Sequence, residues 1–153
     1  MKQTPDPADL RERALRLLAR REHSRFELAR KLAQAGFGHD DIIPLLDAFE
    51  AKNWLSDRRF AESYVADHRA KAGSIKLAYE LRQRGIPDAI IEAVLNENRD
   101  SELDRARAVW QKKFGVAPAD AAEKSRQIRF MQSRGFTPEV TRHVIELTDE
   151  VRT

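Results

Sequence analysis

The apolar residues of this chain recur in a pattern that repeats about every 50 residues. Gly36, Gly85 and Gly135 lie 49 and 50 residues apart, and each is followed directly by a large apolar residue. Apolar residues also stand four and eight positions before each glycine and six, nine and ten positions after it, except at Gln127 and Thr141 in the third copy. These spacings predict an amphipathic helix on each side of a helix-ending glycine. A self-similar period of this length is typical of an array of small units.

A further amphipathic helix is predicted ahead of each glycine-centred pair. Its apolar positions are spaced by three and four residues in all three copies. They are Leu10, Ala14, Leu17 and Leu18 in the first copy, Phe60, Ala61, Tyr64 and Val65 in the second, and Leu103, Ala106, Val109, Trp110 and Phe114 in the third. No segment alternates apolar and polar residues with β-branched enrichment, so no strand is predicted.

Local signals mark where these helices begin and end. Asp6 and Pro7 open the first helix, and Ser24 with Glu27 three residues later forms a capping box. Two prolines suit first helical positions, because the missing N–H costs little there. They are Pro87 and Pro138. Two glycines suit the ends of the leading helices of the second and third copies. They are Gly73 and Gly115.

The predicted fold class is all-α, with nine helices in three tandem three-helix, helix-turn-helix-like repeats. We place the repeats at residues 1–53, 54–99 and 100–153. A unit of about 50 residues buries little apolar surface alone, so neighbouring repeats are expected to pack on one another in an elongated, gently curved array. Trp54 and Leu55 are candidate contacts at the first junction, and residues 95–103 at the second.

Composition excludes several classes of protein. The chain has no cysteine, which removes disulfides, Cys-based zinc sites and a thiol nucleophile. No apolar run approaches the ~18 residues of a membrane span, and the amino terminus lacks a signal-peptide pattern. We therefore expect a cytoplasmic protein without membrane contact.

The net charge of +3 conceals a sorted distribution. Residues 11–31 carry +5, residues 58–84 carry +4 and residues 105–134 carry +6, whereas residues 32–57 carry −4 and residues 85–104 carry −5. Positive charge thus gathers on the first two helices of each repeat and negative charge on the third. Such a stripe fits a phosphate-backbone binder, or a partner protein with an acidic surface. The alternative is a set of solvated helix faces without a partner.

No catalytic pattern is present in the sequence. The four histidines are scattered and lack metal-ligand spacing, and no glycine-rich phosphate loop or nucleophile elbow occurs. The expectation is a protein that is not an enzyme and uses no metal or cofactor. The aromatic residues, Phe26 and Tyr79 among them, recur at helical spacing and are predicted to lie mostly in the core. Contact of Phe26 or Tyr79 with a partner is the alternative.

The most specific run of residues extends from Trp54 to Val65 and is followed by Glu80-Leu-Arg-Gln-Arg-Gly-Ile86. This run resembles the RecX family of bacterial regulators of the RecA recombinase. Residues 14–32 and 123–136 are also similar to the family, so the resemblance covers nearly the whole chain. Three positions depart from the family pattern, which often has glycine or a basic residue there. They are Asn53, Lys71 and Ala78.

The resemblance implies three tandem three-helix repeats and a regulator, mainly an inhibitor, of RecA. Such a protein binds RecA and RecA filaments on single-stranded DNA and modulates filament growth, ATP hydrolysis, strand exchange and co-protease activity, within homologous recombination, DNA repair and the SOS response. Direct contact with single-stranded and double-stranded DNA is also implied. The alternative is a stand-alone DNA-binding module with non-specific phosphate contacts, and a scaffold that binds protein alone is a third reading. We expect a monomer.

The residues predicted to contact the partner are the basic residues of the similar segments. As multiple weak contacts they suit phosphates or acidic patches, and no single residue is expected to be decisive. They are Arg25, Arg30, Lys31, Arg69, Lys71, Lys76, Arg82, Arg84, Arg126, Arg129 and Arg134.

Overall fold

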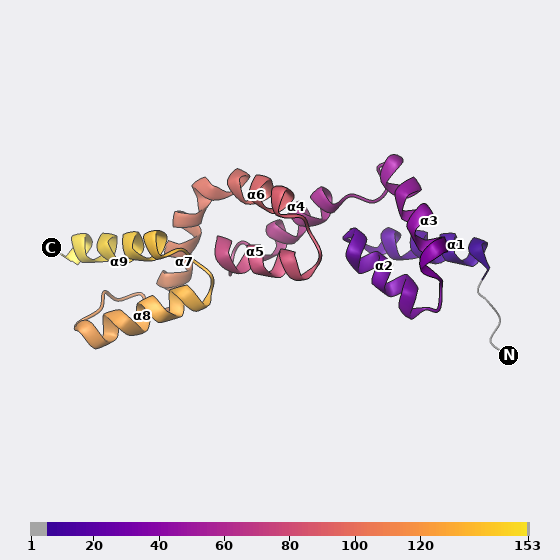
Figure 1. The fold of residues 1–153 in the computed structure, drawn as a ribbon. Helices are drawn as coiled ribbons and strands as arrows, with labels where there is room; N and C mark the ends of the chain where they lie inside the picture. The colour runs from indigo at the N-terminus through magenta and orange to yellow at the C-terminus, as the bar shows by residue number, and fades with distance from the viewer. Residues whose placement is uncertain (1–5, 153) are drawn as a thin grey trace. The chain divides into compact units, whose positions relative to one another are not determined.

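The computed structural model describes the backbone of residues 6–152 and the side chains of residues 6–148. Within this part of the chain nine α-helices and one short 3₁₀-helix form, without strands, which confirms the all-α prediction (Figure 1). The helices are α1 (Pro7–Arg20), α2 (Arg25–Gln34), α3 (His39–Ala51), α4 (Asp57–His68), α5 (Ser74–Gln83), α6 (Asp88–Glu97), η1 (Arg99–Ser101), α7 (Glu102–Lys113), α8 (Ala121–Ser133) and α9 (Pro138–Arg152).

The chain forms two compact units that do not coincide with the repeats. The first unit contains the chain up to Tyr64 together with Leu81–Ile91, and the second contains Val65–Glu80 and the chain from Glu92 onward. The first unit therefore holds all of the first repeat, and the second holds all of the third. Residues of α4, α5 and α6 belong partly to one unit and partly to the other, so the middle repeat has a share in both.

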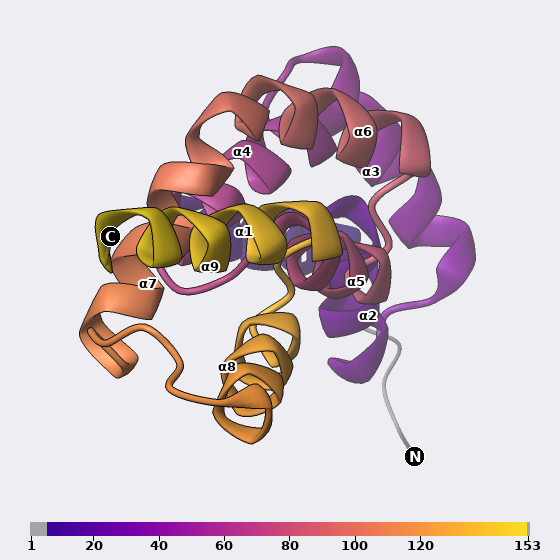
Figure 2. The same ribbon diagram turned by 90° about the vertical axis from the view of Figure 1, so that its left-hand side faces the viewer.

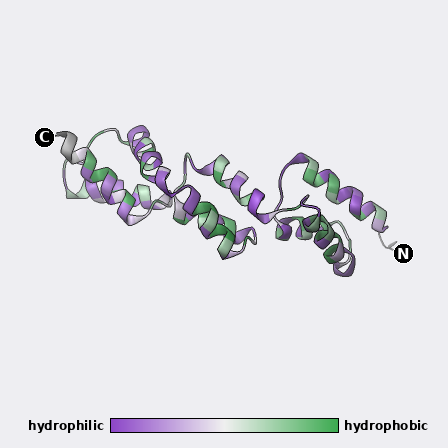
Figure 3. Ribbon diagram, turned by 90° about the horizontal axis from the view of Figure 1, so that it is seen from above, coloured by the Kyte–Doolittle hydropathy of each residue, from purple (hydrophilic) through white to green (hydrophobic). Residues whose placement is uncertain are grey.

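The core of the first unit lies between α1, α2 and α3. Leu28, Leu32, Leu46 and Phe49 are completely buried there, and Leu55 from the segment after α3 joins them. Leu55 was predicted to contact the preceding repeat, and its place in this core confirms that prediction. Apolar and polar residues alternate in short steps along the helices, as expected where one face is buried (Figure 3).

Side-chain caps fix the amino-terminal ends of the first two helices. The Asp6 carboxylate accepts the Ala8 N–H at 2.9 Å, and the Ser24 hydroxyl accepts the Glu27 N–H at 3.0 Å. The capping box predicted at Ser24 is only half formed, because the Glu27 carboxylate binds the Arg21 guanidinium instead. Arg21, six residues before Glu27, competes for the carboxylate that a capping box would use.

The repeated glycines end the second helix of each repeat, as predicted. Gly36, Gly85 and Gly135 have φ values of +100°, +76° and +87°, a conformation that side chains with a Cβ rarely adopt. Asn53 has φ +62°, a left-handed conformation that asparagine adopts more readily than most residues with a Cβ. Of the two prolines, Pro138 opens α9, whereas Pro87 lies one residue before α6 and supplies the carbonyl that accepts the Ile91 N–H.

Two polar residues occupy the core of the third repeat, in which α7, α8 and α9 pack together (Figures 1 and 2). Gln127 and Thr141 are each 1% exposed, at positions that are apolar in the other repeats. Gln127 accepts the Trp110 indole N–H at 2.8 Å and donates to the Val116 carbonyl. The polar substitution at Gln127 is therefore satisfied by the indole, and the third repeat keeps its predicted helical faces.

Two predictions about single residues are wrong. Gly73 was predicted to end a helix, but α4 ends at His68, and Gly73 lies buried just before α5. Phe26 and Tyr79 are 52% and 59% exposed, so neither belongs to the core.

None of the helices in the described part of the chain has the length and apolar character that a membrane span requires.

Candidate functional site

The second unit contains a tight joint between the start of α5 and the end of α8. The Gly73 N–H donates to the Arg134 carbonyl at 2.8 Å, and the Ile75 N–H donates to the Gly135 carbonyl at 3.0 Å. A Cβ placed on Gly135 would lie 2.2 Å from the Cβ of Lys76. We call this contact the second joint; it binds the second helix of one repeat to the glycine turn of the next.

Two residues at the start of α7 hold the loop that leads into this joint. The Arg105 guanidinium donates to the carbonyls of Arg69 and Ala72 at 2.7 and 3.0 Å, and burial lowers its pKa. The Glu102 carboxylate, buried at 5% exposure, accepts both the N–H and the hydroxyl of Ser74. Because the carboxylate sits at the first turn of α5, it also offsets the positive end of that helix.

Four of the predicted contact residues surround the second joint. Arg69 and Lys71 are exposed, and Lys76 and Arg134 are half-buried. Arg69 donates only to the neutral Asn98 amide, at 3.4 Å, and the Arg134 guanidinium lies 5.2 Å from the Phe130 ring centroid. None of the four forms an ion pair with a carboxylate of the described chain. We call them the joint cluster, and their positive charge is not neutralised within the second unit.

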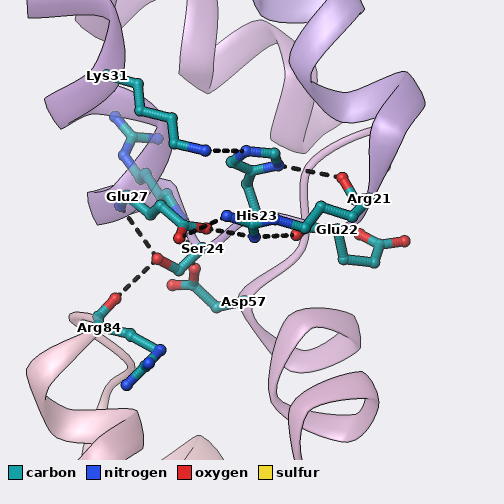
Figure 4. Close-up of polar contacts among 9 residues, drawn as sticks. Arg21, Glu22, His23, Ser24, Glu27, Lys31, Asp57 and Arg84 are labelled. Atoms are coloured by element: carbon teal, nitrogen blue, oxygen red, sulfur yellow. Dashed lines mark hydrogen bonds and ion pairs between the residues drawn. The ribbon is translucent and has the colours of Figure 1, made fainter. Parts of the chain in front are cut away.

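The first unit contains an equivalent joint between the start of α2 and the glycine turn after α5 (Figure 4). The Ser24 hydroxyl donates to the Arg84 carbonyl at 2.7 Å, and the Arg25 N–H donates to the Asp57 carboxylate at 2.8 Å. A Cβ on Gly85 would lie 2.3 Å from the Cβ of Phe26. Asp57 begins α4 just as Glu102 begins α7, so a carboxylate from the next repeat caps the second helix at both joints.

At this first joint the cations are already bound. The Arg25 guanidinium contacts the carboxylates of Asp47 and Glu50, each at 2.8 Å, and the hydrogen bond to Glu50 raises its pKa. The Arg84 guanidinium lies 4.6 Å from the centroid of the Tyr64 ring. Two further arginines at this joint also bind carboxylates, Arg21 that of Glu27 and Arg59 that of Glu22. The first joint is therefore electrostatically satisfied where the second is not.

The remaining predicted cations also fall into two groups, those with an ion pair and those without one. Arg82 binds Asp88 at 2.9 Å, and Arg126 binds Glu123 at 2.9 Å while its guanidinium also lies 5.2 Å from the Phe114 ring centroid. Within the described chain Arg30 and Arg129 have no ion pair, and both are exposed. Each lies six residues before a repeated glycine, and Tyr79 occupies the same position in α5. Within the described chain the joint cluster, Arg30 and Arg129 form no ion pair, and their contact with a partner stays a prediction.

Lys31 makes a different contact, with a buried histidine (Figure 4). Its ammonium lies 2.9 Å from Nε2 of His23, and the other ring nitrogen lies 3.1 Å from the Arg21 carbonyl oxygen. Since an ammonium can only donate, Nε2 accepts and Nδ1 carries the proton that it donates to the carbonyl. His23 is 1% exposed, and burial lowers its pKa, with the charges of Arg21 and Lys31 acting in the same direction.

This contact predicts that acid destabilises the first unit. Because the folded pKa of His23 lies below the ordinary value of 6.5, the unfolded chain binds more protons between the two values. Stability is therefore full above pH 6.5 and falls as the pH drops from there through the folded pKa. Urea unfolding at pH 7.5, 6.5 and 5.5 should show this loss in the wild type and a smaller loss in His23→Gln. The exposed His39→Gln is the control, and a loss equal in all three proteins would contradict the assignment.

Sequence reasoning missed the two residues that build the second joint, Arg105 and Glu102. Their roles depend on carbonyls and N–H groups about 30 residues away, which no local spacing reveals. In the part of the chain that the structure describes, no group of three or more His, Asp or Glu residues is arranged to hold a metal ion. The arrangement can bind anions by charge.

Comparison with known proteins gives consistent matches along the chain. Sequence profiles of the first, second and third three-helix domains of RecX match residues 11–47, 56–95 and 100–145. The "Regulatory protein RecX" of Ralstonia nicotianae is 44% identical over 143 residues, covering 94% of this chain and 90% of the relative. That of Chromobacterium violaceum is 46% identical over 136 residues, covering 89% and 88%. The crystal structure of RecX from Lactobacillus salivarius superimposes with a TM-score of 0.84 at 20% identity, over 94% of this chain and 96% of the other, which shows a common fold.

Proposed function

The chain belongs to the RecX family of regulatory proteins, and from this membership together with its unneutralised cations we propose that it regulates the RecA recombinase. In this proposal it binds RecA and RecA filaments on single-stranded DNA, and it restrains filament growth, ATP hydrolysis, strand exchange and co-protease activity. Regulation is by binding alone.

The observation that carries this proposal is the charge of the joint cluster. Arg69, Lys71, Lys76 and Arg134 form no ion pair with the described carboxylates, whereas Arg25, Arg82 and Arg126 do. Cations without carboxylate partners repel one another, and an anionic partner relieves that repulsion. A filament on single-stranded DNA presents phosphates, and a protein surface can present carboxylates, so both belong to the class of partner that this cluster fits.

The test is a titration of the single-stranded-DNA-dependent ATPase of RecA with the folded protein. We expect the rate to fall at or below one molecule of this protein per RecA, because a protein that blocks filament growth acts on many subunits at once. Bovine serum albumin added at the same concentrations controls for non-specific effects. An unchanged rate at every ratio would contradict the proposal.

The second candidate function is a stand-alone DNA-binding module, and the same cluster favours it because phosphate contacts require only positive charge. The two candidate functions predict different responses of the RecA ATPase to excess single-stranded DNA. A DNA-binding module lowers the ATPase only by competing for the strand, so saturating DNA removes its effect. A filament regulator keeps its effect when the DNA is in excess of RecA.

A further inference from the structure

The third repeat has an open groove between α7 and α9. Its volume is about 660 Å³, and its walls include Trp110, Val116, Val144, Leu147 and Thr148, with the charged Arg107 among them. Val116 is 72% exposed, so the groove has an apolar side chain at its edge in contact with solvent. A cavity of this size accommodates one or two large side chains.

The repeats show which residues of the first repeat correspond to this groove. Arg107 of α7 and Thr148 of α9 line this groove together, as Arg11 of α1 lies against the ring of Phe49 in the first repeat. Counting from the repeated glycine, Thr148 in α9 takes the place of Phe49 in α3, thirteen residues on in both cases.

In the first repeat the corresponding space is filled by aromatic rings. Phe49 is fully buried, and its ring centroid lies 5.4 Å from that of Trp54. The Arg11 guanidinium lies 5.8 Å from the Phe49 centroid and 5.6 Å from the Trp54 centroid. The next residue, Leu55, is buried in the same core. The first repeat thus binds an aromatic residue followed by an aliphatic one, under a guanidinium.

The third repeat lacks both parts of this filling. Thr148 is too small to replace the Phe49 ring, and its hydroxyl is satisfied by the Ile145 carbonyl at 2.6 Å. In the first repeat α3 ends at Ala51 and the chain turns back at Asn53, whereas α9 continues as a helix to Arg152. No segment of the described chain returns to cover the groove between α7 and α9.

We infer that this groove binds an aromatic side chain followed by an aliphatic one on a protein partner, with Arg107 against the ring as Arg11 is in the first repeat. The inference rests on the proposed function, in which that partner is RecA. A guanidinium is attracted to the negative face of an aromatic ring, and a large aromatic residue in a pocket is the usual centre of a protein interface. The groove would then act as an anchor, separate in chemistry from the joint cluster.

Filling the groove from within tests the inference. Thr148→Phe restores the residue of the first repeat, and Thr148→Val is the matched control that leaves the groove open. The probe is a peptide with the sequence of residues 52–57, Lys-Asn-Trp-Leu-Ser-Asp, together with the same peptide with its tryptophan replaced by alanine. We expect the tryptophan peptide to shift the methyl NMR signals of Val144 and Leu147 in the wild type and in Thr148→Val. Its affinity should be at least tenfold lower in Thr148→Phe, and the alanine peptide should shift neither signal.

The second readout is inhibition of the RecA ATPase by the same protein variants. Thr148→Phe should require at least tenfold more protein than Thr148→Val for the same inhibition. Ala108→Leu, which narrows the groove from α7, is the second variant should Thr148→Phe fail to fold, and the same result is expected of it. Equal inhibition by the filled and open variants would overturn the inference and leave the proposed function standing.

Two further outcomes distinguish the possible failures. A wild type that leaves the ATPase unchanged would contradict the proposed function and with it the assignment of RecA as the partner. The peptide titration would then still decide whether the groove takes an aromatic side chain. If Thr148→Phe lowers the affinity for single-stranded DNA and leaves the affinity for the peptide unchanged, the groove takes a nucleobase. That result would overturn the inference.

Discussion

Gly135→Ala is expected to unfold the second unit or to lower its free energy of unfolding by about 2–5 kcal/mol. Two costs add at this position. A left-handed backbone conformation costs a residue with a Cβ roughly 1–2 kcal/mol, and forcing an extra carbon into a packed site costs about 1–3 kcal/mol. The new Cβ would lie 2.2 Å from Lys76 Cβ and 2.5 Å from Lys76 N, so backbone as well as side chain must move.

Gly115→Ala is the matched control for this prediction. Gly115 also has a positive φ, +68°, but the nearest atom to its added Cβ is the Gln111 carbonyl oxygen at 3.2 Å. It therefore carries the conformational cost with little of the close contact. Urea denaturation followed by circular dichroism measures both variants. Equal losses of stability would show that the second joint tolerates displacement, contrary to the geometry described above.

The positions of the helix ends follow from local chemistry and could be predicted from the sequence. Gly36, Gly85 and Gly135 are identified by the apolar residues at fixed spacings around them, because a helix that must bury one face needs both the spacing and a stop. The caps at Asp6 and Ser24 are local for the same reason. Such features depend on residues within one or two turns, which any reading of the sequence sees.

The joints between repeats could not be predicted, because they depend on contacts between distant residues. Gly73 was read as a helix stop, since glycine gives the same local signal whether it ends a helix or lets two backbones approach closely. Asp57 begins α4, yet its carboxylate caps α2 across 32 residues. Only the fold brings the start of one second helix to the end of the next.

The positive charge of the candidate site could be predicted from the sequence, but the partners of its individual residues could not. Counting Lys and Arg found the basic segments, but it could not separate cations with carboxylate partners from cations without them. The Arg126 pair with Glu123 lies within one helical turn and is readable in the sequence, whereas the pairing of Arg25 with Asp47 and Glu50 depends on α3 folding beside α2. The structure therefore separates the eleven predicted contact residues by their internal partners, and their contact with a partner stays a prediction.

Replacing Arg69, Lys71 and Lys76 together by glutamine is expected to weaken binding to single-stranded DNA about 100-fold at ~0.1 M salt. Each phosphate contact on a single strand contributes about 0.7 to the slope of log affinity against log salt. Three lost contacts should thus lower the slope by about 2, which is the specific signature of removed cations. Fluorescence anisotropy with a labelled oligonucleotide, measured from 50 to 300 mM salt, gives both the affinity and the slope.

The matched control removes the same charge from arginines that already bind carboxylates. Arg16, Arg82 and Arg126 pair with Glu12, Asp88 and Glu123, so their replacement by glutamine should change the affinity less than about tenfold. RecA inhibition is measured on the same two proteins. If the Arg69, Lys71 and Lys76 variant loses DNA affinity but still inhibits RecA, the filament regulator is favoured over the stand-alone DNA-binding module. If both triple variants lose the same affinity, net charge governs binding and the joint cluster has no special part in it.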